Sequence, residues 1–220
     1  MNRNFNSYYK RMGLNIDEKT DFIKSQLNRG NIKTVFDFGC ANGVMIETLA
    51  SQYSNIKFIG YDFESVVNKN NGRNLPSNVM YTSVMKKEYF NTQTMVILSS
   101  VLHEIFGGSN EPLRKFHDDF YEYMGYCGMF CIRDMYFTGA KFDKNIQHEI
   151  VYKLYIDNYE EEMKEDYNSI KWDFFGETLR SYKFKLKFDM PYKNNFISEK
   201  IESINKFKTT HRKQVWVRKG

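Results

Sequence analysis

The sequence is short of the residues that break, cross-link or anchor a chain. Only three prolines and three cysteines occur among its 220 residues. No apolar run approaches the roughly 20 residues that a membrane-spanning helix needs. The cysteines are Cys40, Cys127 and Cys131, an odd number that is typical of reduced, packed thiols and not of a disulfide framework. With no histidine or further cysteine beside Cys127 and Cys131, we expect no metal site.

These absences bound the class of protein. A chain that is 41% apolar can bury a full core, and so few prolines disfavour a hinged two-domain construction. We therefore expect a single domain over residues 1–220, soluble and cytoplasmic, with no membrane partner and an oligomeric state that the sequence leaves open. The net charge of +5 permits an acidic partner without requiring one.

The most informative stretch is residues 35–50. The apolar run 35–38 contains Asp37 near its end, Gly39 and Gly43 space a tight turn, and residues 44–50 follow with a helical period. Such a strand, turn and helix suit an anionic or carboxylate-bearing ligand, because the loop and first helical turn present unpaired N–H groups. In an open α/β sheet, ligands bind at the carboxyl ends of parallel strands.

The glycine spacing separates two kinds of nucleotide site. A dinucleotide fingerprint needs glycine at its first, third and sixth positions, where this sequence has Gly39, Ala41 and Val44. The order Asp37, Gly39, Ala41, Gly43 instead resembles motif I of class I S-adenosylmethionine-dependent methyltransferases. A glycine turn after a strand is common, however, so motif I alone leaves other α/β proteins open.

A second strand pattern supports the resemblance. Residues 58–63 form another short apolar run, which contains Asp62 about twenty residues after the first turn. A carboxylate at this place can accept hydrogen bonds from both ribose hydroxyls of a nucleoside, and in the methyltransferase family this is motif II. The alternative interpretation of Asp62 is a solvated acid or a helix cap.

The resemblance implies a cofactor site for S-adenosylmethionine. It implies that Asp37 holds the methionine ammonium directly or through water, and that the loop backbone cradles that end of the cofactor. Asp62 would hold the ribose, and Phe63 would line the adenine pocket. The family usually places an acid or amide after the third strand, where this sequence has Thr82 and Ser83. The expected cofactor residues are Asp37, Gly39, Cys40, Ala41, Gly43, Asp62, Phe63, Ser83, Ser99 and Ser100.

The remaining periodicity completes the expected fold. Further strands are predicted over 78–84, 94–100, 128–135, 183–188 and 213–218. Helices are predicted from Asp17 to Gly30, within an N-terminal segment of about 1–30, and from Asn110 to Gly125; residues 64–74 form a helix or loop. The expected class is α/β, a three-layer sandwich. Its sheet has seven mostly parallel strands, the last antiparallel, and a helical insertion at about 140–182 follows the fifth strand. By resemblance, the seventh strand lies between the fifth and sixth.

Candidate catalytic residues follow the fourth strand. Residues 101–104 (Val-Leu-His-Glu) resemble the post-strand motif of small-molecule and O-methyltransferases, and differ from the Asn/Asp-Pro-Pro-Tyr motif of many amino-methyltransferases. His103 and Glu104 could supply a general base. Adjacent helical residues point roughly a hundred degrees apart, so both cannot easily serve one atom. The alternative is that His103 packs beneath the loop.

Two further groups lie near the expected site. His211, at the entry to the last strand, is a second candidate for substrate contact. Arg133 and Asp134, at the end of the fifth strand, form either a structural ion pair or part of the substrate mouth.

We therefore expect an enzyme, a methyltransferase that uses S-adenosylmethionine and an unidentified acceptor. Methylation of oxygen on a small molecule or nucleotide-like substrate is favoured by the turn at 101–104 and by the covering insertion. Basic residues between Lys206 and Lys219, with Phe207 and Trp216 among them, keep an RNA substrate open, although a half-buried strand gives the same pattern. The alternative of another class is a non-catalytic cofactor-binding or interaction protein.

Overall fold

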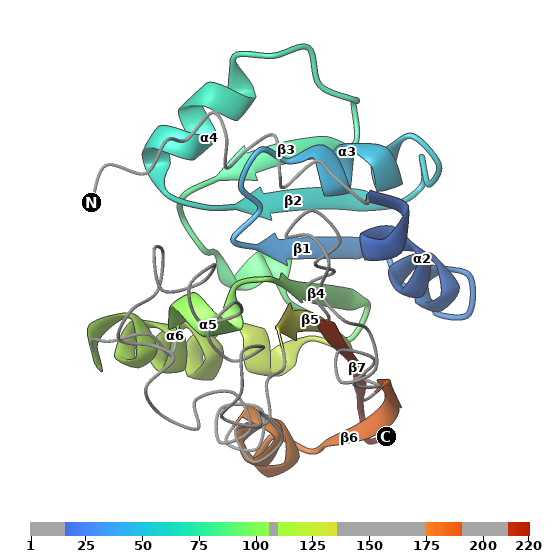
Figure 1. Cartoon of the computed structure of the whole chain (residues 1–220), viewed down its shortest axis with the longest axis vertical. Coiled ribbons are helices and arrows are strands. Elements are labelled where there is room, and N and C mark those ends of the chain that lie inside the picture. Colours follow the sequence, from blue (N-terminus) through green and yellow to red (C-terminus); the bar gives the residue numbers. More distant parts are fainter. Residues whose placement is uncertain (1–15, 106–109, 136–174, 191–210) are drawn as a thin grey trace, which may run out of the picture.

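The protein is built on one seven-stranded sheet (Figure 1). The computed structural model describes residues 16–105, 110–135, 175–190 and 211–220. The strands are β1 (Thr34–Phe38), β2 (Lys57–Tyr61), β3 (Val79–Thr82), β4 (Thr94–Ser99), β5 (Met129–Met135), β6 (Phe184–Met190) and β7 (His211–Arg218). Their order across the sheet is β3-β2-β1-β4-β5-β7-β6.

The strand directions confirm the predicted topology. β1 pairs in parallel with β2 and with β4, and β3 and β5 extend the parallel part on either side. β7 runs antiparallel to both β5 and β6, between which it is inserted. The connection reverses direction between β1 and β4, and at such a switch point the carboxyl ends of the strands open a crevice for ligands.

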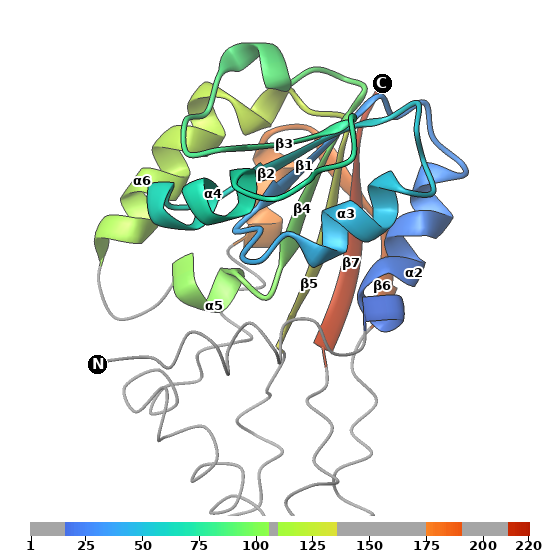
Figure 2. The same ribbon diagram turned by 90° about the horizontal axis from the view of Figure 1, so that it is seen from above.

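Helices cover both faces of the sheet (Figure 2). One face carries α2 (Ile16–Leu27), α3 (Val44–Ala50) and α4 (Glu64–Asn71), which share one apolar core. The other face carries α5 (Leu102–Ile105), α6 (Asn110–Glu122) and a helix over 175–181, which share a second core. Short 3-10 turns lie at η1 (Lys87–Tyr89) and η2 (Met124–Tyr126). The three-layer prediction is therefore confirmed.

Successive strand residues supply the two cores in turn. Val35 packs toward α2 and α3, whereas Phe36 packs toward α5 and α6. Because both faces are covered, all six residues of β4 are buried. Asp37 comes two residues after Val35 and so lies on the α2 side of the sheet, which decides its surroundings in the site.

The edge strand β6 departs from the predicted one-sided pattern. Residues 183–188 alternate between lysines and apolar residues, and this alternation predicts that the apolar side chains share a buried face. The structure has a register shift between Leu186 and Phe188. One extra residue in a strand moves the following side chains to the other face. Phe184 is buried, whereas Phe188, which follows the shift, is 39% exposed. Leu186 precedes the shift and is 38% exposed on this edge strand.

Some predicted segments lie largely outside the described residues. These are the chain before Ile16 and most of the insertion expected at 140–182. Within that range the structure describes the helix over 175–181, where Phe175 and Leu179 are buried against the sheet. Residues 64–71 are helical, which settles the choice between helix and loop. None of the helices in the described ranges is long and apolar enough to cross a membrane.

Candidate functional site

The loop after β1 adopts a backbone that needs its glycines. Gly39 and Gly43 have φ angles of 76° and 72°, in the left-handed region that disfavours other residues. A Cβ on Gly39 would lie 2.8 Å from Cγ2 of Val101, and one on Gly43 would lie 1.8 Å from the Tyr81 hydroxyl. Ala41 is also left-handed, with a φ of 49°. Motif I is therefore a tightly packed turn.

The hydrogen bonds of this loop correct one expectation. The sequence predicts unpaired N–H groups that face a ligand, but the N–H groups of Gly39 and Cys40 both donate to the Tyr61 carbonyl, over 2.9 and 3.0 Å. The Gly43 N–H donates to the Cys40 carbonyl over 2.9 Å. A tight turn satisfies its own donors because buried N–H groups are costly without partners. The loop can shape a ligand site, but these three N–H groups already have partners.

Asp62 is bound to this loop. Its Oδ2 accepts a hydrogen bond from the Ala41 N–H over 2.8 Å, and its Oδ1 accepts one from the Phe63 N–H over 2.8 Å. The carboxylate thus joins the end of β2 to the turn after β1. A carboxylate oxygen can accept more than one hydrogen bond, so these two bonds are compatible with the predicted ribose contact.

Asp37 is a buried acid at the centre of the site. It is 2% exposed, and burial, together with the negative charge of Asp62, raises its pKa to about 8; the positive charge of Lys19 opposes this shift. Lys19 belongs to α2 and is itself buried. A carboxyl group with a strongly raised pKa beside a ligand crevice is typical of a functional site, and its charged form would be stabilised by a cationic ligand.

Tyr81, which the sequence analysis did not single out, fills the space beside the glycines. A Cβ on Gly60 would lie 2.5 Å from the Tyr81 ring, and the Tyr81 hydroxyl donates to Oε1 of Glu47 over 2.5 Å. Burial and the bond to Glu47 raise the pKa of Tyr81. A glycine inside an apolar strand often marks a close approach of other groups. Gly60 is therefore the feature of the sequence that could have indicated a large side chain packed against β2.

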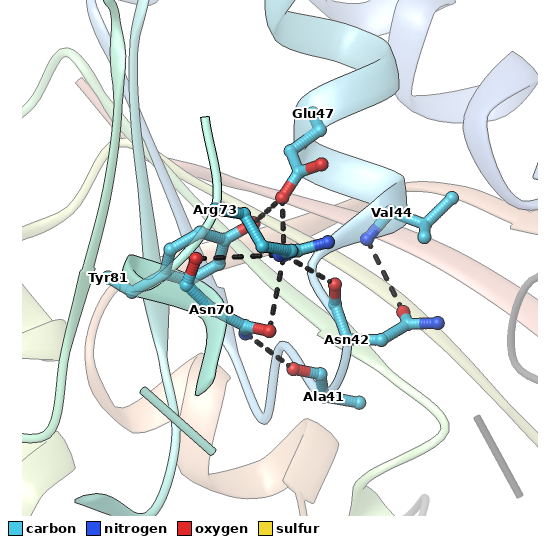
Figure 3. Close-up of polar contacts among 7 residues, drawn as sticks. All are labelled: Ala41, Asn42, Val44, Glu47, Asn70, Arg73 and Tyr81. Atoms are coloured by element: carbon cyan, nitrogen blue, oxygen red, sulfur yellow. Dashed lines mark hydrogen bonds and ion pairs between the residues drawn. The ribbon is translucent and has the colours of Figure 1, made fainter. Parts of the chain in front are cut away.

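A second unpredicted group lies beside α4 (Figure 3). Nη2 of Arg73 donates to the Asn42 carbonyl over 2.9 Å and to Oε1 of Glu47 over 2.6 Å. The same atom lies 3.2 Å from Oδ1 of Asn70. Nδ2 of Asn70 donates to the Ala41 carbonyl over 2.8 Å. The loop is thus bonded to α4 as well as to β2.

The residues expected beside the adenine are Phe63 and Ser83, after β2 and β3. Phe63 is 80% exposed. Oγ1 of Thr82 donates to the Val84 carbonyl over 3.0 Å and accepts from the Val84 N–H over 3.1 Å, so this hydroxyl forms a local turn. Ser83, the next residue, is half-buried. Thr82 and Ser83 thus present hydroxyl groups at this place after β3, and neither is an acid or an amide.

The turn after β4 is bonded to the end of β5. The Ser100 N–H donates to the Arg133 carbonyl over 2.7 Å, and Nη1 of Arg133 donates to Oγ of Ser100 over 3.2 Å. Oδ2 of Asp134 accepts from the Leu102 N–H over 2.6 Å and so caps α5. Ser99, in contrast, is buried at the end of β4. Arg133 and Asp134 therefore support the turn from opposite faces of β5.

The catalytic candidates are placed by their backbone. His103 and Glu104 lie in α5, directly after β4, and His211 begins β7 opposite Met135. All three positions lie at the edge of the sheet where β1 ends, while their side chains fall outside the described part of the chain. Among the described residues, no group of three or more potential metal ligands gathers.

Several solved structures that resemble this fold are methyltransferases, although neither a protein-family model nor a curated protein sequence matches this chain. The methyltransferase domain of bacterial CtHen1-C has a TM-score of 0.60 and 14% identity, over 94% of this chain and 100% of that one. A putative O-methyltransferase from Nostoc punctiforme has a TM-score of 0.59 and 13% identity, over 97% and 60%. The plantazolicin methyltransferase BpumL has a TM-score of 0.55 and 14% identity, over 98% and 89%. The chain therefore has the class I methyltransferase fold.

Proposed function

We propose that this protein is a methyltransferase that uses S-adenosylmethionine. The observation that carries the proposal is the pair Asp37 and Asp62 at the ends of β1 and β2, one buried with a raised pKa and the other bonded to the glycine loop. A buried carboxyl group suits the ammonium of the methionine part, and a carboxylate at the end of β2 suits ribose hydroxyls. Structures of the similar fold were solved with S-adenosylhomocysteine for BpumL and with S-adenosylmethionine for LepI.

The other residues have supporting roles in this proposal. The loop 39–43 would enclose the methionine end by its shape, and the exposed Phe63 ring would gain a partner by packing against adenine. Ser83 would lie beside the adenine, while Ser99 and Ser100 would border the reactive methyl group. The cofactor supplies an activated methyl group, so the protein must mainly align the acceptor and exclude water.

For the acceptor, we propose an oxygen on a small or nucleotide-like molecule, with His103, Glu104 or His211 as candidate groups beside it. The turn at 101–104 lacks the Asn/Asp-Pro-Pro-Tyr motif, and similar folds include a mitomycin 7-O-methyltransferase. The RNA alternative depended partly on Trp216, which is 1% exposed in β7 and cannot stack on a base.

The test is calorimetric titration of S-adenosylmethionine and S-adenosylhomocysteine into the purified protein. We expect both to bind to the wild type and both to bind at least about tenfold more weakly to Asp37→Asn, because an amide cannot neutralise an ammonium. Asp21→Asn is the matched control, since Asp21 is an exposed aspartate on α2. A folded wild-type protein that binds neither nucleoside would refute the proposed function.

A positive result would be followed by a search for the acceptor. Conversion of S-adenosylmethionine to S-adenosylhomocysteine would be followed with pools of small hydroxylated molecules and with RNA. Turnover with a hydroxylated molecule supports the proposal, whereas turnover with RNA alone, with binding that weakens steeply with salt, would favour the RNA alternative. Cofactor binding without any turnover would favour the non-catalytic alternative.

A further inference from the structure

Both backbone polar groups of Ala41 are hydrogen-bonded to side chains. Its N–H donates to Asp62, and its carbonyl accepts from Nδ2 of Asn70, each over 2.8 Å. Ala41 has a left-handed φ of 49°, a backbone conformation that is unfavourable for a residue with a Cβ. Such a conformation persists only where its surroundings determine it. The two hydrogen bonds supply that determination.

Asn70 is suited to this task because both ends of its amide have partners. The residue is 3% exposed at the end of α4. Nδ2 reaches the Ala41 carbonyl, and Oδ1 lies 3.2 Å from Nη2 of Arg73. A buried amide bonded at both ends has a fixed orientation. Asn70 therefore defines where the Ala41 carbonyl lies.

Arg73 extends this contact to the other side of the loop. Its guanidinium bonds the Asn42 carbonyl and the Glu47 carboxylate. Glu47 lies in the first turn of α3 and also accepts from the Tyr81 hydroxyl. Figure 3 shows the guanidinium between the loop, α3 and Asn70. The segment at the end of α4 is thus bonded to two successive loop carbonyls, those of Ala41 and Asn42.

We propose that Asn70 and Arg73 are positioning residues that hold the loop 39–43 in the shape required by the amino-acid end of the cofactor. This inference rests on the proposed function. α4 begins directly after Asp62 and Phe63, which would bind the nucleoside end, and it ends at the loop, which would enclose the methionine end. The two residues therefore couple the two halves of one ligand site, although neither needs to touch the ligand.

The coupling predicts a selective loss of affinity. S-adenosylhomocysteine contains both halves of the ligand, whereas 5′-methylthioadenosine contains the nucleoside without the amino acid. A displaced loop should weaken the first ligand and leave most of the affinity for the second. Asp62 would lose its bond from Ala41 but would keep the bond from the Phe63 N–H, and Phe63 lies outside the loop. A general loss of folding would weaken both ligands equally.

The test compares Asn70→Asp with Asn68→Asp. The substitution at Asn70 is isosteric and keeps an acceptor for Arg73, but it replaces the donor to the Ala41 carbonyl by a repelling oxygen. Asn68 lies two residues earlier on α4, is exposed, and serves as the matched control. By calorimetry, we expect affinity for S-adenosylhomocysteine to fall about tenfold or more in Asn70→Asp, and affinity for 5′-methylthioadenosine to fall less than about threefold. Asn68→Asp should match the wild type for both ligands.

A second measurement needs no ligand. Amide hydrogen exchange should become faster at Ala41 and Gly43 in Asn70→Asp, and should not change there in Asn68→Asp. Arg73→Ala removes a side chain at the surface of the site and offers a variant that keeps the buried amide. It should show the same selective loss of S-adenosylhomocysteine, and Arg73→Lys, which retains a cation beside Glu47, should restore part of it.

The outcomes separate the two proposals. If the wild type binds both ligands and the variants lose neither, or lose both equally, the positioning role is wrong and the proposed function stands. Unchanged exchange at Ala41 in Asn70→Asp would equally overturn the positioning role. If the folded wild type binds neither ligand, the proposed function is rejected, and the positioning role is rejected with it.

Discussion

At the scale of single residues, the site is dominated by an acid that folding makes hard to ionise. Asp37 is buried, Asp62 adds a negative charge nearby, and Lys19 only partly compensates, so the pKa of Asp37 is raised to about 8. An unfolded chain would ionise the same carboxyl near its ordinary pKa of 3.8. The protein thus keeps an unfavourable group where a cation would make it favourable, as functional sites often do.

The raised pKa gives a pH dependence with a definite sign. Between about pH 4 and pH 8 the folded state keeps a proton that the unfolded state has released. The contribution of Asp37 to the free energy of unfolding therefore falls as pH rises, by at most about 1.4 kcal/mol per pH unit. Asp37→Asn removes this dependence, so its stability relative to the wild type should increase from pH 5 to pH 8. Urea unfolding without added nucleoside at several pH values measures the difference, and a constant difference would contradict the assigned pKa.

Gly60 tests the packing beside the loop. Its backbone is ordinary, but a Cβ would lie 2.5 Å from the Tyr81 ring and 2.9 Å from Sγ of Cys40. Gly60→Ala should therefore destabilise the protein by about 1–3 kcal/mol through overpacking. Gly72→Ala is the control, because the nearest atom to its Cβ would be 3.6 Å away. Equal denaturation midpoints for the two variants would show that Tyr81 can move aside.

At the scale of elements, the turn after β4 is held by another strand. α5 has only four residues and cannot be stable through its own hydrogen bonds. Its first N–H donates to Asp134, which lies at the end of β5. Strand β5 therefore fixes the place of the segment that contains His103 and Glu104.

This arrangement predicts different effects for two substitutions of Asp134. Asp134→Ala removes the cap of α5 and should cost about 1–2 kcal/mol, with faster hydrogen exchange at Leu102. Asp134→Asn retains an acceptor oxygen and should keep most of the stability. If the amide variant is as unstable as the alanine variant, the charge of Asp134 matters more than its hydrogen bond.

Sequence reasoning succeeded for elements with local patterns and failed where distant residues decide. The strands with Asp37 and Asp62 follow from apolar runs that end near an acid, and both lie where the patterns indicated. The bonding of Ala41 to Asn70 joins positions 29 residues apart, and no periodicity encodes such a pair. The exposure of Phe188 was mispredicted because it follows a one-residue shift between paired strands, which is invisible in one strand's sequence. Leu186 precedes the shift and is exposed on the edge strand of the sheet.

At the scale of the whole molecule, one sheet separates two cores, and the candidate site lies at the carboxyl ends of its parallel strands. The core beneath α5 and α6 is rich in aromatic rings, with Phe120 and Phe130 stacked at 5.6 Å and Phe130 against Phe184 at 5.2 Å. The other core is mainly aliphatic and lies under the loop and Asp37. Substitutions in the aromatic core should thus change stability more than ligand affinity.

Because β7 lies between β5 and β6, the sheet cannot be completed until β7 has been synthesised. During synthesis β6 emerges before β7, yet among the described strands β7 is its only neighbour. Until β7 arrives, β5 and β6 each present an unpaired edge, and such edges invite pairing with other chains. Strand β6, which is synthesised first, contains Lys185, Lys187 and the register shift after Leu186. Lysines and strand irregularities hinder the pairing of an exposed strand with other chains, so we expect these features to limit aggregation of the newly made chain.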